Sequence, residues 1–238
     1  MISFVIPAYN EEALIGQTLE SVTHAVKHLD EPFEIVVTDD ASSDQTATIA
    51  EALGARVIKV NLRQIAAARN AGARHARGDR LIFVDADTVV NEAVVGAAVE
   101  AMKRGAVGGG SAVSFEGQVP RYAELMQPVL VRLFRASGLA CGCFLFCTRD
   151  AFDAVGGFDE ELFASEEIGM SLALKRQGRF VVLRESVTTS GRKLRMYSGK
   201  QVLLIMSRIL LGGPKALKNR ERLELWYSGR REDPEIAQ

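Results

Sequence analysis

The sequence predicts an α/β fold with parallel strands, because the same local pattern occurs three times in the first part of the chain. Short runs of apolar and β-branched residues lie at 2–6, 34–38 and 56–60. Each run is followed by polar turn residues and then by a helical pattern. Strands that alternate with helices indicate βαβ units, in which neighbouring strands run parallel and helices cover the sheet.

A fourth strand is predicted at 81–84, and it ends in Asp85-Ala86-Asp87. A short, continuous, β-favouring run of this kind is typical of a strand buried on both faces. Ligands of open α/β sheets bind beyond the carboxyl ends of the strands, so both aspartates are expected at a ligand site. Two carboxylates in this arrangement suit a hard divalent cation that also holds substrate phosphates. An ordinary acidic loop is the alternative interpretation of so short a motif.

The ends of the first two strands add polar residues to the same edge of the sheet. Residues 7–12 read Pro-Ala-Tyr-Asn-Glu-Glu, and residues 39–44 read Asp-Asp-Ala-Ser-Ser-Asp. The helical segment after the third strand contains Ala-Ala-Ala-Arg-Asn-Ala-Gly at 66–72. Parallel strands bring their carboxyl ends together, so these turns and the Asp-x-Asp motif are expected to converge. Packing alone does not require that convergence.

Length and composition fit one globular domain. The chain has 238 residues, of which 47% are hydrophobic and 25% charged, and that is enough for a full core. Met1 leads almost directly into the first strand, so we expect no signal peptide and a cytoplasmic protein. Cys141, Cys143 and Cys147 could form a metal site or lie in a buried strand. We favour the strand, because zinc ligands usually come as paired Cys knuckles.

Charge is unevenly distributed, although the net charge is −1. Residues 175–231 contain 15 Lys or Arg and three Glu, a net charge of +12. Residues 232–238 add three acids, so residues 1–174 carry −10. This asymmetry indicates an anionic partner near the C-terminal segment. Apolar residues at helical spacing in 202–210 lie among Arg192, Lys193, Arg195, Lys200 and Arg208. They predict either a helix packed on the domain or an interfacial helix on anionic lipid. No recognition motif indicates nucleic acid.

The order of the motifs resembles the family-2 glycosyltransferases of GT-A fold. The matching pieces lie at 6–12, 39–44, 68–72 and 85–87, with Gly-Gly-Phe-Asp-Glu at 156–160 and Ser-Glu-Glu at 165–167. The resemblance implies an α/β, GT-A (nucleotide-diphospho-sugar transferase) fold with a Rossmann-like central mixed sheet flanked by helices. It also implies a single domain over 1–238. Within it we expect a nucleotide-binding half at 1–115, an acceptor and catalytic half at 116–190, and a basic, partly amphipathic segment at 191–238.

The same resemblance implies a metal-dependent inverting glycosyltransferase that moves one sugar from a nucleotide-diphosphate sugar to a hydroxyl acceptor. The implied cofactor is a divalent cation, Mn²⁺ or Mg²⁺, which would stabilise the charge of the leaving diphosphate. Asp87 is the implied metal ligand, and Asp85 would bind the ribose or a metal-bound water. The implied contacts to the donor nucleotide are Pro7, Ala8, Tyr9, Glu11, Asp40, Arg69, Asp85 and Ala86.

The family's catalytic base is the aspartate of a Glu-Asp pair, and here the pair is Glu166-Glu167. Glu167 therefore occupies the position of the base, with a side chain one methylene longer, and Glu166 is its competitor. Both are carboxylates of similar reference acidity, so general-base chemistry is retained. Gly169 and Ala173 depart from the acidic and basic residues that relatives often carry nearby. Alternatively, both glutamates simply favour the N-terminal dipole of the helix predicted at 166–177.

Two alternative functions remain open from the sequence. One is a polyprenyl-phosphate glycosyltransferase that acts at the membrane surface. Such an enzyme would be peripheral on the inner face of the membrane, and its acceptor would be lipid-linked instead of a carbohydrate. The other is a catalytically weak homologue that binds a nucleotide sugar, as the Glu167 departure would allow. Processive polysaccharide synthesis is not indicated, because the Gln-x-x-Arg-Trp signature is missing and Trp226 is the one tryptophan.

Overall fold

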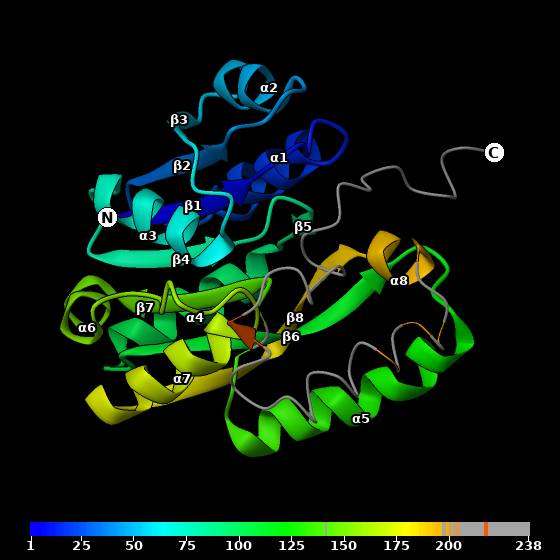
Figure 1. The fold of residues 1–238 in the computed structure, drawn as a ribbon. Helices are drawn as coiled ribbons and strands as arrows, with labels where there is room; N and C mark the ends of the chain where they lie inside the picture. The colour runs from blue at the N-terminus through cyan, green and yellow to red at the C-terminus, as the bar shows by residue number, and fades with distance from the viewer. Residues whose placement is uncertain (141, 197–198, 200, 202–203, 205–216, 219–238) are drawn as a thin grey trace.

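The structure is a computed structural model that describes residues 1–140, 142–196, 199, 201, 204 and 217–218. In this part of the chain, eight strands form one sheet in the order β3-β2-β1-β4-β7-β6-β8-β5 (Figure 1). The strands are β1 (Ile2–Ala8), β2 (Phe33–Asp40), β3 (Arg56–Val60), β4 (Arg80–Val84), β5 (Thr88–Val89), β6 (Gly108–Glu116), β7 (Phe144–Thr148) and β8 (Phe180–Ser190).

The four strands predicted from the sequence lie within β1 to β4, and their parallel pairing is confirmed. Val5 of β1 pairs with Val36 of β2 on one side and with Phe83 of β4 on the other. β7 is antiparallel to both β4 and β6, and β8 runs parallel to β6. The sheet is therefore mixed, as the family resemblance implied, and β1, β2, β4, β6 and β8 end at the same edge.

Helices cover both faces of the sheet (Figure 1). They are α1 (Ile15–Ala25), α2 (Thr46–Ala52), α3 (Ile65–His75), α4 (Glu92–Lys103), α5 (Arg121–Ser137), α6 (Arg149–Val155), α7 (Glu166–Gln177) and α8 (Arg192–Met196). Ile82 and Val84 of β4 pack with residues of α1 and α4, whereas Leu81 and Phe83 pack with residues of α3, α6 and α7. Successive strand residues point to opposite faces, so β4 is apolar on both sides.

Small residues allow α3 to lie close against β1 and β2. A Cβ atom added at Gly72 would come within 2.5 Å of both Val5 Cγ1 and Thr38 Oγ1. Ala66 and Ala73 of the same helix are buried in the core on this face. The alanine-rich run that the sequence analysis identified is therefore explained by close helix–sheet packing, which fixes Arg69 of α3 relative to the strand ends.

Two further sequence predictions concern membranes and cysteines. Among the described residues, no helix has the length and apolar character that crossing a bilayer requires. The apolar run at 202–210, apart from Leu204, lies outside the described residues, as does Cys141. Cys147 is buried in β7, and Cys143 is buried just before it.

Candidate active site

The turns that follow β1 and β2 are interlocked by hydrogen bonds. The backbone N–H of Asn10 donates to Ser42 Oγ at 3.0 Å, and that of Ser43 donates to Asn10 Oδ1 at 2.8 Å. The N–H of Glu11 donates to Thr46 Oγ1 at 2.8 Å. The turn predicted to surround the nucleoside is thus fixed against the loop that carries the aspartate pair.

Three other predicted donor contacts lie at this edge. Pro7 and Ala8 are the last residues of β1 and pair with Thr38 and Asp39 of β2. The carbonyl of Ala86, just beyond β4, accepts a hydrogen bond from Thr18 Oγ1 at 2.9 Å. The backbone positions implied by the family resemblance are therefore brought to one edge by the parallel pairing.

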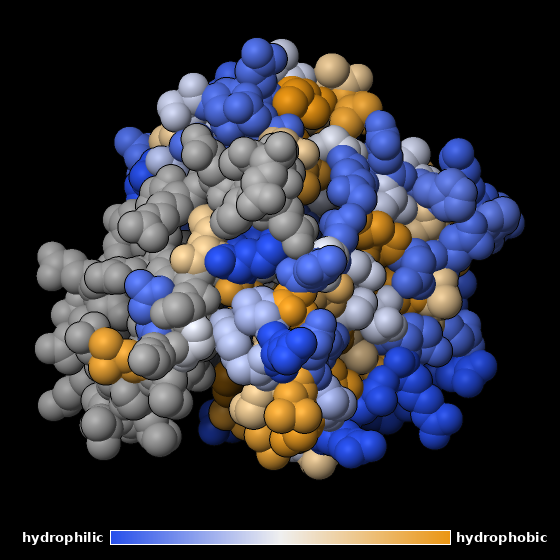
Figure 2. All heavy atoms as spheres, turned by 90° about the vertical axis from the view of Figure 1, so that its right-hand side faces the viewer, coloured by the Kyte–Doolittle hydropathy of each residue, from blue (hydrophilic) through white to orange (hydrophobic). Residues whose placement is uncertain are grey.

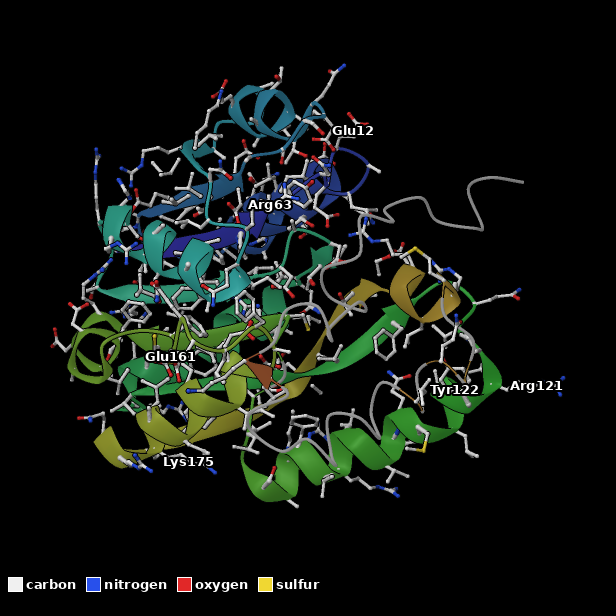
Figure 3. The ribbon with its side chains drawn as sticks, in the orientation of Figure 1. Glu12, Arg63, Arg121, Tyr122, Glu161 and Lys175 are labelled. Atoms are coloured by element: carbon white, nitrogen blue, oxygen red, sulfur yellow. The ribbon has the colours of Figure 1, made fainter. Side chains whose placement is uncertain are left out.

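Asp40 and Tyr9 both interact with the loop that precedes α3. The Asp40 carboxylate accepts hydrogen bonds from the backbone N–H groups of Leu62, Arg63 and Gln64, at 2.6, 2.8 and 3.0 Å. The guanidinium carbon of Arg63, which Figure 3 labels, lies 3.7 Å from the centroid of the Tyr9 ring. Asp40 therefore orders the loop before α3, and its contact to a base stays a prediction.

Arg69 joins two of the predicted site acids. Its guanidinium donates from Nη2 to Asp85 Oδ1 at 2.7 Å and to the carbonyl of Gly142 at 2.9 Å. From Nη1 it donates to Glu166 Oε1 at 2.6 Å. The side chain is 2% exposed, and its Nε has no hydrogen-bond partner. Burial alone would lower the pKa of Arg69, but the charges of Asp85 and Glu166 raise it above its ordinary value. Arg69 therefore stays charged.

The two glutamates at the start of α7 have different surroundings. Glu166 is buried against Arg69. Glu167 is partly exposed and lies beside Gly142, where an added Cβ would come within 3.1 Å of its Oε1. Its charge also helps to raise the pKa of Arg69, so both carboxylates lie near the same guanidinium. The structure thus brings Glu166, Glu167, Asp85 and Arg69 together.

A second buried arginine, Arg192 at the start of α8, holds Asp87. Its Nη2 donates to Glu11 Oε2 and, at 3.2 Å, to Asp87 Oδ2. Its side chain is 3% exposed, and its Nε has no hydrogen-bond partner. Burial alone would lower the pKa of Arg192, whereas the charges of Glu11 and Asp87 raise it. Thr189 Oγ1 donates to Asp87 Oδ1 at 3.3 Å from the end of β8.

The sequence analysis did not identify Arg192 as a site residue. It grouped Arg192 with the basic residues around a possible interfacial helix, and the structure instead buries it beside Asp87. The signal was present in the apolar run that starts at Phe180, because a strand there ends at Ser190, two residues before Arg192. A strand predicted at that run, parallel to the others, would have placed Arg192 at the same edge.

The chemistry of Asp85 and Asp87 fits a divalent cation. Each aspartate forms an ion pair with one buried arginine, at 2.7 Å for Asp85 and 3.2 Å for Asp87. Within the described residues, no cluster of three or more His, Cys, Asp or Glu side chains could enclose a metal ion. Mg²⁺ is commonly held by one or two carboxylates together with substrate phosphates, so these two residues suffice if a diphosphate completes the coordination.

Comparison with known proteins shows which family of proteins this chain resembles. The model of the family described as "Glycosyl transferase family 2" matches residues 3–155. An undecaprenyl-phosphate 4-deoxy-4-formamido-L-arabinose transferase from Serratia proteamaculans is 40% identical over 93 residues, which are 36% of this chain and 28% of that protein. The chain therefore matches less than a third of the length of this relative.

Two solved structures show the same fold at low sequence identity. The mannosyltransferase PcManGT from Pyrobaculum calidifontis, in complex with GDP-Man and Mn²⁺, has a TM-score of 0.66 and 21% identity, over 88% of this chain and 61% of that chain. TarS of S. aureus has a TM-score of 0.61 and 24% identity, over 97% of this chain and 44% of that chain. Both the Pyrobaculum and the Staphylococcus proteins are GT-A glycosyltransferases, so the predicted GT-A fold is confirmed.

Proposed function

Because the chain belongs to glycosyl transferase family 2, we propose that this glycosyltransferase moves one sugar from a nucleotide-diphosphate sugar to a hydroxyl acceptor with the help of a divalent cation. The observation that carries the proposal is the pairing of Asp85 with Arg69 and of Asp87 with Arg192. These pairs lie at the edge where ligands of α/β sheets bind. Residues 1–115 would bind the donor and residues 116–190 the acceptor.

The charge balance of this edge supports metal dependence. Five carboxylates, those of Glu11, Asp85, Asp87, Glu166 and Glu167, surround the guanidinium groups of Arg69 and Arg192. The excess of negative charge would repel a diphosphate that arrived alone. A divalent cation, when bound by Asp87 and Asp85, would supply Lewis-acid stabilisation of the leaving diphosphate.

The protein's own residues would then position the donor. Pro7, Ala8, Tyr9, Glu11, Asp40 and Ala86 are the proposed contacts to the nucleoside, as the family resemblance implies. Arg69 fixes the orientation of Asp85, because its Nη2 is held both by this carboxylate and by the carbonyl of Gly142. Arg192 is buried beside Asp87 and would place a fixed positive charge close to the diphosphate.

We assign the general base to Glu167 and a positioning role to Glu166. A base must reach the proton of the acceptor hydroxyl within hydrogen-bond distance. Glu166 is buried, and its carboxylate is held by Arg69, so an acceptor could approach it only by displacing that contact. Glu167 is partly exposed at the same helix start. Attack by the deprotonated hydroxyl in a single displacement would invert the anomeric centre.

A lipid-linked acceptor is the second candidate function. The relative from Serratia proteamaculans is named as an undecaprenyl-phosphate transferase, which favours a polyprenyl-phosphate acceptor at a membrane surface. The match covers 36% of this chain and 28% of that protein, so it does not extend over the whole of either chain. We therefore keep the lipid-linked acceptor as the alternative to a carbohydrate.

The proposal is tested by thermal denaturation with a panel of nucleoside diphosphates, each with and without Mn²⁺. A ligand that binds only the folded state stabilises it by RT ln(1 + L/Kd), where L is the free ligand concentration, so the melting temperature rises with the logarithm of that concentration once it exceeds Kd. We expect one diphosphate to stabilise the protein, and to do so more strongly with Mn²⁺. The proposal fails if none of the diphosphates stabilises the protein with the metal present. Slow release of free sugar from the matching donor would distinguish an active enzyme from a binding homologue.

A further inference from the structure

Helix α5 exposes a stripe of large apolar side chains. Leu125, Val129 and Leu133 recur every four residues and are 77%, 57% and 61% exposed. Met126 is exposed beside them. Residues four positions apart lie on the same face of a helix, so these side chains form one continuous stripe. Contiguous exposed apolar surface of this kind marks a site of interaction with a protein or a membrane.

Two exposed arginines, Arg121 and Arg132, border this stripe. On a helix of 3.6 residues per turn, Arg132 lies about 60° from Val129, on the side away from Met126. Arg121 lies further round on the same side, about 80° from Val129. Figure 3 shows Arg121 pointing away from the body of the molecule at the start of α5. The outer face of α5 therefore combines an apolar stripe with a basic border.

The opposite side of α5 attaches it to the body of the protein. Gln127 Nε2 donates to the carbonyl of Val113 in β6 at 3.0 Å, and Arg135 Nη2 donates to that of Arg184 in β8 at 2.7 Å. Lys175 of α7 donates from Nζ to the carbonyl of Ser137 at 2.5 Å. Figure 1 shows α5 along the lower edge of the molecule, below β6 and β8. The helix is therefore anchored, with its stripe facing outward.

We propose that α5 docks the protein on an anionic lipid surface. Interfacial helices insert an apolar face at the boundary of headgroups and acyl chains, and their basic residues contact the anionic headgroups. Helix α5 contains three arginines and one acid, Glu124, so a second copy of α5 would offer little charge to oppose the border. Anionic phospholipid headgroups would pair with Arg121 and Arg132.

The position of α5 relates this surface to the donor edge. The helix follows β6, which ends at the same edge as β1, β2 and β4, so a lipid surface bound at α5 would lie beside that edge. Figure 2 views this edge from the front, and orange hydrophobic side chains gather at its lower margin, at the level of α5. The proposal does not depend on which acceptor the enzyme uses.

The test is sedimentation with vesicles of phosphatidylcholine and phosphatidylglycerol at 7:3, in the absence of donor, compared with phosphatidylcholine alone. We expect binding to the anionic vesicles that weakens as salt rises. Replacing Leu125, Val129 and Leu133 together by Gln should lower binding by at least about tenfold, since each loses a large apolar side chain. Arg121→Gln with Arg132→Gln keeps the stripe and should remove the preference for anionic vesicles.

The matched control replaces two exposed leucines elsewhere, Leu172 in α7 and Leu53 just after α2, by Gln, and should bind like the unmodified protein. The proposal is overturned if the unmodified protein does not sediment with anionic vesicles, or if the triple variant binds as well as it does. It is also overturned if light scattering finds a dimer that the triple variant converts to a monomer, because a second copy would then occupy the stripe. These measurements need no transfer activity, so they can fail independently of the proposed function.

Discussion

Replacing Arg69 by methionine removes the charge that holds two acids of the proposed active site together. Glu166 is buried, and Asp85 is partly exposed; both lie within 2.7 Å of the guanidinium. Removing one partner of a buried ion pair typically costs 3–5 kcal/mol, because the remaining charge is left without compensation. We therefore expect Arg69→Met to lower the free energy of unfolding by about 3–5 kcal/mol, or the melting temperature by roughly 6–20 °C.

A double-mutant cycle with Glu166→Gln separates the ion pair from the loss of packing. When Glu166 is already neutral, removal of Arg69 leaves fewer buried charges unpaired. The double variant should therefore lose less free energy of unfolding than the sum of the losses in the two single variants. A coupling of about 1–3 kcal/mol is expected for residues in direct contact. Urea denaturation of all four proteins measures it.

Arg74 provides the control from the same helix. It is 61% exposed, and its nearest approach to Glu160 is 3.9 Å. Exposed ion pairs contribute about 0–1 kcal/mol, so Arg74→Met should change stability little. The reasoning is refuted if Arg69→Met costs no more than Arg74→Met, or if the single costs in the cycle simply add.

Three other predictions follow from the ion pairs and carboxylates of the structure. Arg192→Gln removes the positive charge beside Asp87, so calorimetry should find tighter Mn²⁺ binding without nucleotide; weaker metal binding would contradict this. Burial alone would raise the pKa of Glu34, but hydrogen bonds from the Arg77 backbone and Ser3, with the charge of Arg56, lower it below its ordinary value. Its stabilising contribution is therefore present above the unfolded pKa, about 4.5, and is lost as pH falls through the lower folded value. Glu34→Gln should thus destabilise the protein at pH 7, and the difference should disappear as pH falls below the folded pKa of Glu34. Exposed Glu51→Gln is the control and should change stability little at pH 7. A gap that persists at low pH would exclude this cause. Glu167→Gln should slow transfer, or donor hydrolysis, by about 10²–10⁴-fold with nucleotide affinity retained, and Glu167→Asp should keep more activity. A larger loss in Glu166→Gln than in Glu167→Gln would reverse the assignment.

The first half of the sheet could be predicted because its signals are local. Each of β1 to β4 is a short apolar run that ends in polar residues, and parallel pairing follows from the helices between them. The convergence of Tyr9, the Asp39-Asp40 pair and Asp85-Ala86-Asp87 then follows from topology. The insertion of antiparallel β7 between β4 and β6 depends on pairing across the whole chain, and the residue pattern does not specify it.

The pairing partners of the site residues could not be predicted. Arg69 contacts Glu166 across 97 positions, and Arg192 contacts Asp87 across 105. Each contact depends on where a helix starts relative to a distant strand end, and periodicity does not contain that information. Asp40 shows the same limit, because its carboxylate binds the backbone of a loop more than 20 residues away. Composition assigned Arg192 to a basic segment, whereas the end of β8 brings it to the edge of the proposed active site.

The most direct test of the proposed function is calorimetric titration of the matching nucleoside diphosphate into the protein and into Asp87→Asn, with and without Mn²⁺. If Asp87 holds a cation shared with the diphosphate, Mn²⁺ should strengthen binding to the unmodified protein, and Asp87→Asn should largely lose that enhancement. Asp85→Asn should bind more weakly while keeping part of the response to metal. Full metal-assisted binding by Asp87→Asn would contradict the proposed role of Asp87.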